Sequence, residues 1–368
     1  MVRWRSGTVT GVGRRWHGAV EVTVRVGAES LRALAYPALV GEPRDGDRVL
    51  LNVGALTMGL GTGGYALVVA LPDRLPADPP DAVDSRAGGH LVKARYTPLQ
   101  AIVLGADEEA SPHRAALAAA DDLGGMPVVT ADLHSALPAI VAGLHADRPD
   151  ARVAYVMTDG GALPAWFSRT LDGLRGHLAG TVTVGQAFGG DLEATNTHAG
   201  LLAARHALGA DVAVVAQGPG NLGTGTPWGF SGVSTGEAVN AAATLGGRPV
   251  GSLRISGADP RPRHRGLSHH SVTAYGRVAL RPADLVLPHP LPGDLAAGVA
   301  AALAPLASAH SITAHRIVEV STGGLDDALR ASPVRLSTMG RGLAEDPAYF
   351  LAAAAAGRHA AALLPPRG

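Results

Sequence analysis

Cysteine is absent from this sequence of 368 residues. The absence excludes disulfide bonds, thiolate nucleophiles, zinc–cysteine sites and cysteine-ligated iron–sulfur clusters. The 31 Lys+Arg residues are balanced by 31 Asp+Glu residues, so the chain lacks the positive excess that general nucleic-acid and membrane-surface binders need. Nucleic acid and membranes are therefore disfavoured as partners, whereas a local basic patch and a homo-oligomer are compatible with the composition.

Long apolar runs are also missing. No run reaches the roughly 20 residues of a membrane-spanning helix, and the first residues, MVRWRSGTVTG, lack the apolar core of a secretory signal. We therefore expect a cytoplasmic protein. Apolar residues make up 46% of the chain, as in ordinary globular proteins, and the length favours two domains.

Residues 1–71 predict a small β-barrel of the OB or SH3-like kind. Five segments of strand length follow one another, separated by Gly, Asp and Pro. These segments are 8–12, 19–26, 31–36, 48–53 and 65–70. Residues 72–89 contain four prolines and four aspartates, a composition typical of an extended linker.

Residues 90–368 predict an α/β domain with a doubly wound, mostly parallel, Rossmann-like sheet, because apolar β-branched segments alternate with helical ones. The strand-like segments are 100–104, 127–130, 152–158, 181–184, 211–216, 250–255, 285–288, 312–320 and 334–337. The helical segments are 113–122, 136–144, 163–178, 192–208, 237–245, 294–306 and 346–356. Ligands of such a sheet bind beyond the carboxyl ends of its strands, so polar residues that follow a strand are candidates for a site.

The segment TDGGALP (158–164) follows the strand RVAYVM. Gly160 and Gly161 let backbone amides approach an anion at a helix start, and Asp159 can hold a metal ion, a hydroxyl or an amine. Alternatively, Thr158 or Asp159 only caps the helix. In a second loop, 185–196, the best candidate is Asp191, unless its charge only complements the dipole of the next helix.

The segment GPGNLGTGT (218–226) contains the spacing GxGxxG after a strand. A dinucleotide fingerprint also needs a helix that starts inside the motif and an acidic residue about 20 residues later, and the sequence has neither. NAD and FAD are therefore disfavoured as cofactors, and a P-loop is excluded because its lysine is missing. The remaining interpretation is a nest of backbone amides and hydroxyls that binds an anion. Its members are Gly218, Gly220, Gly223, Thr224, Gly225 and Thr226.

The most polar stretch, RISGADPRPRHRGLSHHS (254–271), predicts a loop. Arg263 and Arg265 suit a phosphate or a carboxylate, because a guanidinium group binds these anions with two parallel hydrogen bonds. His269 and His270 suit acid–base catalysis near neutral pH. Since the two are adjacent, we expect their side chains to point in different directions, so that at most one of them meets a given ligand.

The same stretch also offers ligands for a divalent metal ion. The predicted set combines His264 with one of the two adjacent histidines, His270 first, and with a carboxylate such as Asp259, Asp191 or Asp159. No HxxxH, HExxH or HxH spacing supports this set. The alternative is structural: Ser268 caps a helix that begins with the two histidines, and the arginines pair with Asp259.

Several phrases of the sequence have a known counterpart. They are GGHLVKARYTPLQ (88–100), TDGGALP (158–164), GPGNLGTGT (218–226), RHRGLSHHS (263–271) and STMGR (337–341). In these phrases the chain resembles, over nearly its whole length, a bacterial family catalogued as a domain of unknown function, number three-eight-six-six of that series. The resemblance implies no activity and no catalytic residues, so the loops are interpreted by their chemistry alone.

These loops together favour an enzyme, a hydrolase or group transferase rather than an oxidoreductase. Its substrate would be small and anionic, for example phosphate- or nucleotide-containing. The catalytic candidates are His269, His270, Asp159 and Asp191, and the anion would be held by the two glycine-rich loops with Arg263 and Arg265. The alternative is a non-catalytic module in which the barrel binds a ligand or single-stranded nucleic acid through its basic, aromatic start, Arg3-Trp4-Arg5.

Overall fold

The computed structural model describes residues 2–61, 63–77, 89–291, 295–308 and 313–366. It contains two compact units, one made of Met1–Leu104 and Trp166–Asp172 and the other of Gly105–Ala165 and Gly173–Gly368. The first unit thus extends past the predicted barrel end at residue 71. Of the predicted linker 72–89, residues 78–88 lie outside the described part of the chain. None of the helices in the described ranges is long and apolar enough to cross a membrane.

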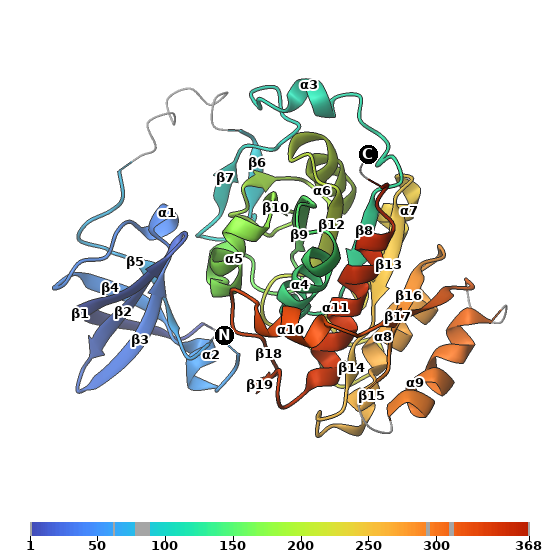
Figure 1. The fold of residues 1–368 in the computed structure, drawn as a ribbon. Helices are drawn as coiled ribbons and strands as arrows, with labels where there is room; N and C mark the ends of the chain where they lie inside the picture. The colour runs from blue at the N-terminus through green and yellow to red at the C-terminus, as the bar shows by residue number, and fades with distance from the viewer. Residues whose placement is uncertain (1, 62, 78–88, 292–294, 309–312, 367–368) are drawn as a thin grey trace. The chain divides into compact units, whose positions relative to one another are not determined.

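The first unit contains the predicted β-barrel, which is confirmed (Figure 1). Its strands are β1 (Trp4–Trp16), β2 (Ala19–Val26), β3 (Glu29–Ala35), β4 (Arg48–Asn52) and β5 (Ala66–Ala70), with short helices α1 (Pro37–Val40) and α2 (Gly54–Thr57). The strands close in the order β1-β2-β3-β5-β4, and β1 pairs with β4. Alternate residues such as Val22, Val24 and Leu51 fill the interior, as the period of a strand requires.

Beside the barrel, the first unit includes a hairpin and a distant segment. The hairpin, β6 (Leu91–Lys93) and β7 (Ala101–Val103), takes up the strand predicted at 100–104, which therefore does not belong to the large sheet. The segment Trp166–Asp172 packs Trp166 and Phe167 against the barrel residues Trp16 and Tyr36. Nε1 of Trp16 donates to the carbonyl of Trp166 over 2.7 Å, so this indole is both buried and hydrogen-bonded.

The second unit is built on an eight-stranded sheet in the order β11-β10-β9-β12-β8-β13-β16-β17. Every neighbouring pair is parallel, so the predicted α/β sheet is confirmed. The strands are β8 (Pro127–Thr130), β9 (Val153–Thr158), β10 (Gly180–Thr183), β11 (Leu192–Glu193), β12 (Val212–Gln217), β13 (Arg248–Ser252), β16 (Asp284–His289) and β17 (Arg316–Ser321). Two small hairpins lie outside it, β14 (Ile255–Ser256) with β15 (Gly266–Leu267) and β18 (Ser337–Thr338) with β19 (Arg341–Gly342).

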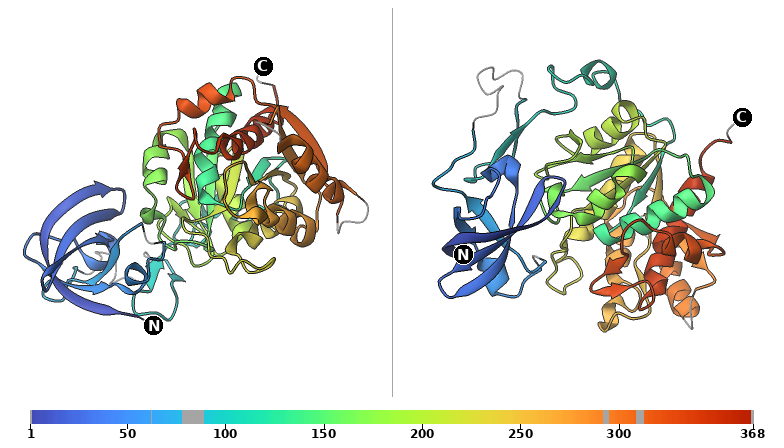
Figure 2. Two further views of the ribbon diagram at one scale, coloured as in Figure 1. Left: turned by 90° about the horizontal axis from the view of Figure 1, so that it is seen from below. Right: turned by 60° about the vertical axis from the view of Figure 1, so that its left-hand side comes forward.

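Helices cover the sheet on both faces. They are α3 (Arg114–Leu117), α4 (Leu137–Asp147), α5 (Arg169–Leu174), which straddles the two units, α6 (Thr197–Leu202), α7 (Ser234–Thr244), α8 (His269–Thr273), α9 (Leu295–Leu303), α10 (Leu325–Arg330) and α11 (Pro347–Ala362). On one face, α4 and α11 lie side by side (Figures 1 and 2). The two helices can cross closely because Gly143 and Gly357 have no Cβ. A Cβ at either position would overlap the backbone of the other helix. On the other face, α6 and α7 form a core with Val128, Val156 and Val215.

The connections define the place where a ligand is expected. The chain leaves β8 through α4 on one face of the sheet, and it leaves the neighbouring strand β12 through α7 on the other. The carboxyl ends of β8 and β12 therefore flank a topological switch point, where open α/β sheets bind ligands. The residues that follow β8, β12 and β13 meet there.

Candidate functional site

The side chains of Asp132, Arg254 and His270 meet at the switch point, and all three are buried. Asp132 follows β8, Arg254 follows β13 and His270 lies in the first turn of α8. Oδ2 of Asp132 is 3.4 Å from Nη1 of Arg254 and 3.2 Å from Nδ1 of His270. Burial alone would raise the pKa of Asp132, but the hydrogen bond with His270 and the charge of Arg254 outweigh burial and lower this pKa. The Asp132 carboxylate is thus held in its charged form inside the protein.

Three imidazole rings surround one point. The ring centroids of His264, His269 and His270 are 4.5 to 4.9 Å apart. The expectation that the adjacent His269 and His270 point apart is wrong. Although neighbouring side chains on a helix diverge by about 100°, both rings here contact His264, which the turn between β14 and β15 brings beside the start of α8.

Ser268 organises this cluster. Its hydroxyl accepts a hydrogen bond from the backbone N–H of His270 over 3.2 Å and lies 2.7 Å from Nδ1 of His264. The capping role that the structural alternative predicted is therefore present, and it coexists with the cluster. Burial, with smaller effects of nearby positive groups such as Arg254, lowers the pKa of His264 to about 3. Burial likewise lowers the pKa of His269 to about 4, so these rings are neutral at pH 7.

Asp259 does not join the histidines. Its two oxygens accept hydrogen bonds from Nε and Nη2 of Arg261 over 2.9 and 2.8 Å, and Nη2 of Arg341 lies 3.3 Å from Oδ2. The bidentate bond from Arg261 holds the pKa of Asp259 well below its usual range. The predicted metal set of His264, His270 and Asp259 therefore needs a correction. The carboxylate of Asp259 is paired with arginines, and the third side chain beside His264 and His270 is that of His269.

The other two carboxylate candidates lie toward a different part of the sheet. Oδ2 of Asp159 accepts a hydrogen bond from the N–H of Gln186, in the loop after β10. Oδ2 of Asp191 accepts from both the N–H and the hydroxyl of Thr181, the second residue of β10. Since β10 is separated from β8 by β9 and β12, both side chains are directed away from the histidine cluster.

Packing accounts for several of the glycines in the two predicted anion loops. A Cβ at Gly161 would overlap the carbonyl of Gly218, and one at Gly218 would approach the carbonyl of Ala162 to 2.5 Å. A Cβ at Gly160 would lie 2.6 Å from Oε1 of Gln217. The loops after β9 and β12 thus need these glycines in order to pack on one another.

The remainder of the loop after β12 is closed on itself. The N–H of Thr224 donates to the carbonyl of Gly229 over 2.7 Å, and the N–H of Gly229 donates to the hydroxyl of Thr226 over 3.1 Å. Gly220 and Gly225 have φ angles of 90° and 83°, which favour glycine, whereas Gly223 pairs with Phe230. This loop meets the histidine stretch where Phe230 stacks on His270 and where Nη2 of Arg263 is 3.6 Å from the position of a Cβ on Gly225.

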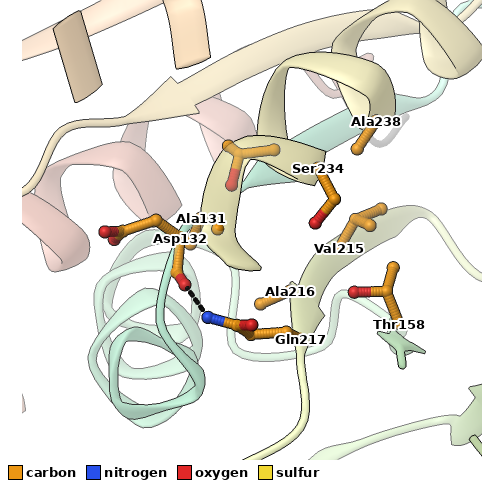
Figure 3. Close-up of a pocket in the computed structure, with 10 residues that line it drawn as sticks. Ala131, Asp132, Thr158, Val215, Ala216, Gln217, Ser234 and Ala238 are labelled. Carbon is orange, nitrogen blue, oxygen red and sulfur yellow. Dashed lines mark hydrogen bonds between the residues drawn. The ribbon is translucent and has the colours of Figure 1, made fainter. Parts of the chain in front are cut away.

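A narrow pocket lies under the start of α7, at the ends of β8, β9 and β12 (Figure 3). Nε2 of Gln217 spans it and donates to the backbone carbonyl of Asp132 over 2.6 Å. Within the described residues, Oε1 of Gln217 and Oγ1 of Thr158 are buried without a hydrogen-bond partner. The hydrogen bond of Gln217 ties the end of β12 to the residue that follows β8, and it thereby positions Asp132.

The sequence interpretation missed Asp132 and Gln217. Asp132 follows a predicted strand just as Asp159 does, so the rule of polar residues after strands would have found it. Phe230 stacks on His270 with ring centroids 3.7 Å apart and planes inclined by 4°. The sequence offers Phe230, together with Trp228, as an apolar wall or stacking face, but it does not predict the partner, because the contact depends on how the loop after β12 folds back.

Comparison with known proteins identifies the family to which the sequence is similar. The model of one protein family, described as a protein of unknown function (DUF3866), matches residues 32–357. A search of the curated proteins gives no match.

Proposed function

The chain belongs to the family described as a protein of unknown function (DUF3866), and from the chemistry of its site we propose that it is an enzyme, a hydrolase or group transferase that acts on a small anionic substrate. The observation that carries this proposal is the buried Asp132–His270 pair beside the imidazoles of His264 and His269 at the switch point of the sheet. The burial of charged and titratable groups is costly for stability. Such groups nevertheless cluster at functional sites, since the chemistry there needs them.

The histidines supply the group that activates a nucleophile. Oδ2 of Asp132 and Nη1 of Arg254 both lie 3.2 Å from Nδ1 of His270, and these contacts hold the ring in place. An imidazole held in this way is placed for proton transfer with water or with a hydroxyl group. The redox alternative has no support in these residues, since neither a dinucleotide fingerprint nor a cysteine is present in the sequence.

Two arginines supply the attraction for an anion. Arg263 and Arg265 are exposed, and neither forms a salt bridge within the described residues, in contrast to Arg254 and Arg261. Arg263 also lies close enough to His269 to contribute to the lowering of its pKa. A guanidinium group without a carboxylate partner, next to a cluster of neutral imidazoles, is suited to hold a phosphate or carboxylate.

The test is the binding of inorganic phosphate to the full chain, measured by isothermal titration calorimetry at low salt. Arg263→Gln should weaken binding roughly 10- to 150-fold, the effect of about 1.5 to 3 kcal/mol for a hydrogen bond to a charged group. The control is Arg281→Gln, which alters an exposed arginine just before β16. Arg281 thus lies at the amino-terminal end of a strand, whereas the site lies beyond the carboxyl ends. Equal phosphate affinity in both variants would contradict the proposal.

Catalysis is tested separately by turnover of p-nitrophenyl phosphate monoesters and diesters. We expect His270→Asn to abolish turnover while phosphate binding through Arg263 persists. Unchanged turnover in this variant would remove the histidine from the reaction.

The barrel supports a second function, the binding of single-stranded nucleic acid. It is a closed five-stranded barrel, an architecture that can bind oligonucleotides, and Trp4 on β1 is 49% exposed between Arg3 and Arg5. If these residues stack on bases, Trp4→Ala weakens the binding of a fluorescent oligonucleotide to the full chain, and salt weakens it further. Trp228→Ala is the control, since Trp228 is equally exposed, at 55%, in the other unit.

A further inference from the structure

The three imidazoles at the switch point are arranged as ligands of one ion. His264, His269 and His270 each offer a ring nitrogen, and the three nitrogens lie within 4.8 Å of one another. In a tetrahedral zinc site with Zn–N bonds of about 2.0–2.1 Å, the ligand nitrogens are about 3.4 Å apart. Movements on the order of 1 Å or less, within reach of side-chain rotation, would bring the rings to this geometry.

The hydrogen bonds of the rings leave the required nitrogens available. Nδ1 of His264 is engaged by the hydroxyl of Ser268 over 2.7 Å, and Nδ1 of His270 lies 3.2 Å from Oδ2 of Asp132. His264 and His270 therefore each keep a second ring nitrogen, Nε2, that is available to a metal ion. Metal-bound histidines almost always hold their second nitrogen in this manner, through a carboxylate, a carbonyl or another polar group.

His269 gives the independent sign of a ligand. Its Nε2 is buried, and it has no hydrogen-bond partner among the residues that the structure describes. A buried ring nitrogen without a partner is costly, and a bound cation would remove this cost. Phe230 packs on His270 and against the edge of His269, so it forms an apolar wall on one side of the cluster.

The nature of the ligands selects the ion. Three imidazoles without a thiolate suit Zn²⁺ and its neighbours among the transition metals, whereas Mg²⁺ and Ca²⁺ require oxygen ligands. The nearest carboxylates are engaged elsewhere, Asp132 by Arg254 and His270 and Asp259 by Arg261. They offset the charge of Arg254, which would otherwise oppose a cation.

We propose that His264, His269 and His270 bind one Zn²⁺ ion, with Asp132 and Ser268 as positioning residues. Three protein ligands leave a fourth position for water or substrate, which is the arrangement of catalytic zinc sites. The inference rests on the proposed function and changes one role in it: with the ion on the ring nitrogen of His270, a zinc-bound water would supply the nucleophile in place of activation by the free ring.

The experiment is a Zn²⁺ titration of the full chain, freed of metal by a chelator, in competition with a chromophoric zinc indicator. The wild-type protein binds one equivalent of Zn²⁺. His269→Gln weakens this binding at least 100-fold through the loss of one of three ligands, and Asp132→Asn weakens it 10- to 100-fold. His145→Gln, which changes a half-buried histidine paired with His177 outside the cluster, leaves it unchanged.

A second measurement needs no variant. Co²⁺ bound to the wild-type chain gives the intense visible absorption of a four-coordinate ion. A weak six-coordinate spectrum, or Zn²⁺ binding that responds to His145 and not to His269, overturns the inference.

The two proposals fail separately. If Zn²⁺ does not bind but turnover resists chelators and depends on His270, the metal site is refuted and the enzyme stands. If Zn²⁺ binds as described but neither phosphate binding nor turnover depends on Arg263 and His270, the proposed function is refuted and the metal site stands.

Discussion

Replacing Asp132 by asparagine tests whether the site is held together by its buried charge. The side chains of Arg254 and Asp132 are only 4% and 8% exposed, and removal of one partner of such a pair costs about 3–5 kcal/mol, because the other charge stays buried. Arg254 keeps a second carboxylate, that of Asp259, at 3.7 Å, and asparagine keeps the shape. We therefore expect Asp132→Asn to lower the free energy of unfolding by about 2–3 kcal/mol.

The assay is urea unfolding at pH 7.5, followed by circular dichroism, with Asp326→Asn as the matched control. Asp326 pairs with Arg330 on the surface of α10, where the two side chains are 52% and 67% exposed. The loss of such a pair costs less than about 0.5 kcal/mol. If Asp132→Asn were no more destabilising than Asp326→Asn, the buried network would not be organised by charge.

Two further predictions concern the scaffold. Gly357→Ala should destabilise the protein by about 1–3 kcal/mol, because the added Cβ would overlap the carbonyl of Ile140. The measurement is the Tm, which should fall. Gly298→Ala is the control and should be neutral or stabilising, because Gly298 lies in a helix with open space around it. Burial lowers the pKa of His134 to about 4, below the value of about 6.5 in an unfolded chain. The contribution of neutral His134 to the free energy of unfolding is therefore complete above pH 6.5. Between pH 6.5 and pH 4 this contribution is lost by about 1.4 kcal/mol per pH unit. In urea unfolding between pH 7.5 and 4.5, the His134→Gln variant should lack this part of the pH dependence.

The local pattern of the chain was sufficient to predict the architecture. Val-rich segments separated by turn residues predicted the five barrel strands, and apolar segments such as 127–130 and 211–216 became central strands of the sheet. Errors occurred where burial depends on the rest of the fold. Residues 192–208 have the composition of one helix, but Leu192–Glu193 is an edge strand and α6 begins at Thr197, after the cap Asn196.

The site was predictable only in part, for the same reason. The rule of polar residues beyond strand ends located the histidine stretch, but not its geometry. Whether His269 and His270 converge depends on the hairpin that brings His264 to the start of α8, which is a contact between separate elements. Asp159 and Asp191 follow strands too, yet the strand order directs them toward β10, and strand order is not encoded in local composition.

The most direct test of the central claim is anomalous diffraction from crystals of the full chain grown with Zn²⁺, recorded on both sides of the zinc absorption edge. The account predicts one anomalous peak among the imidazoles of His264, His269 and His270, about 2.0–2.1 Å from each ligating nitrogen, with Asp132 on Nδ1 of His270. A peak at other residues, with these three rings unchanged, would contradict it.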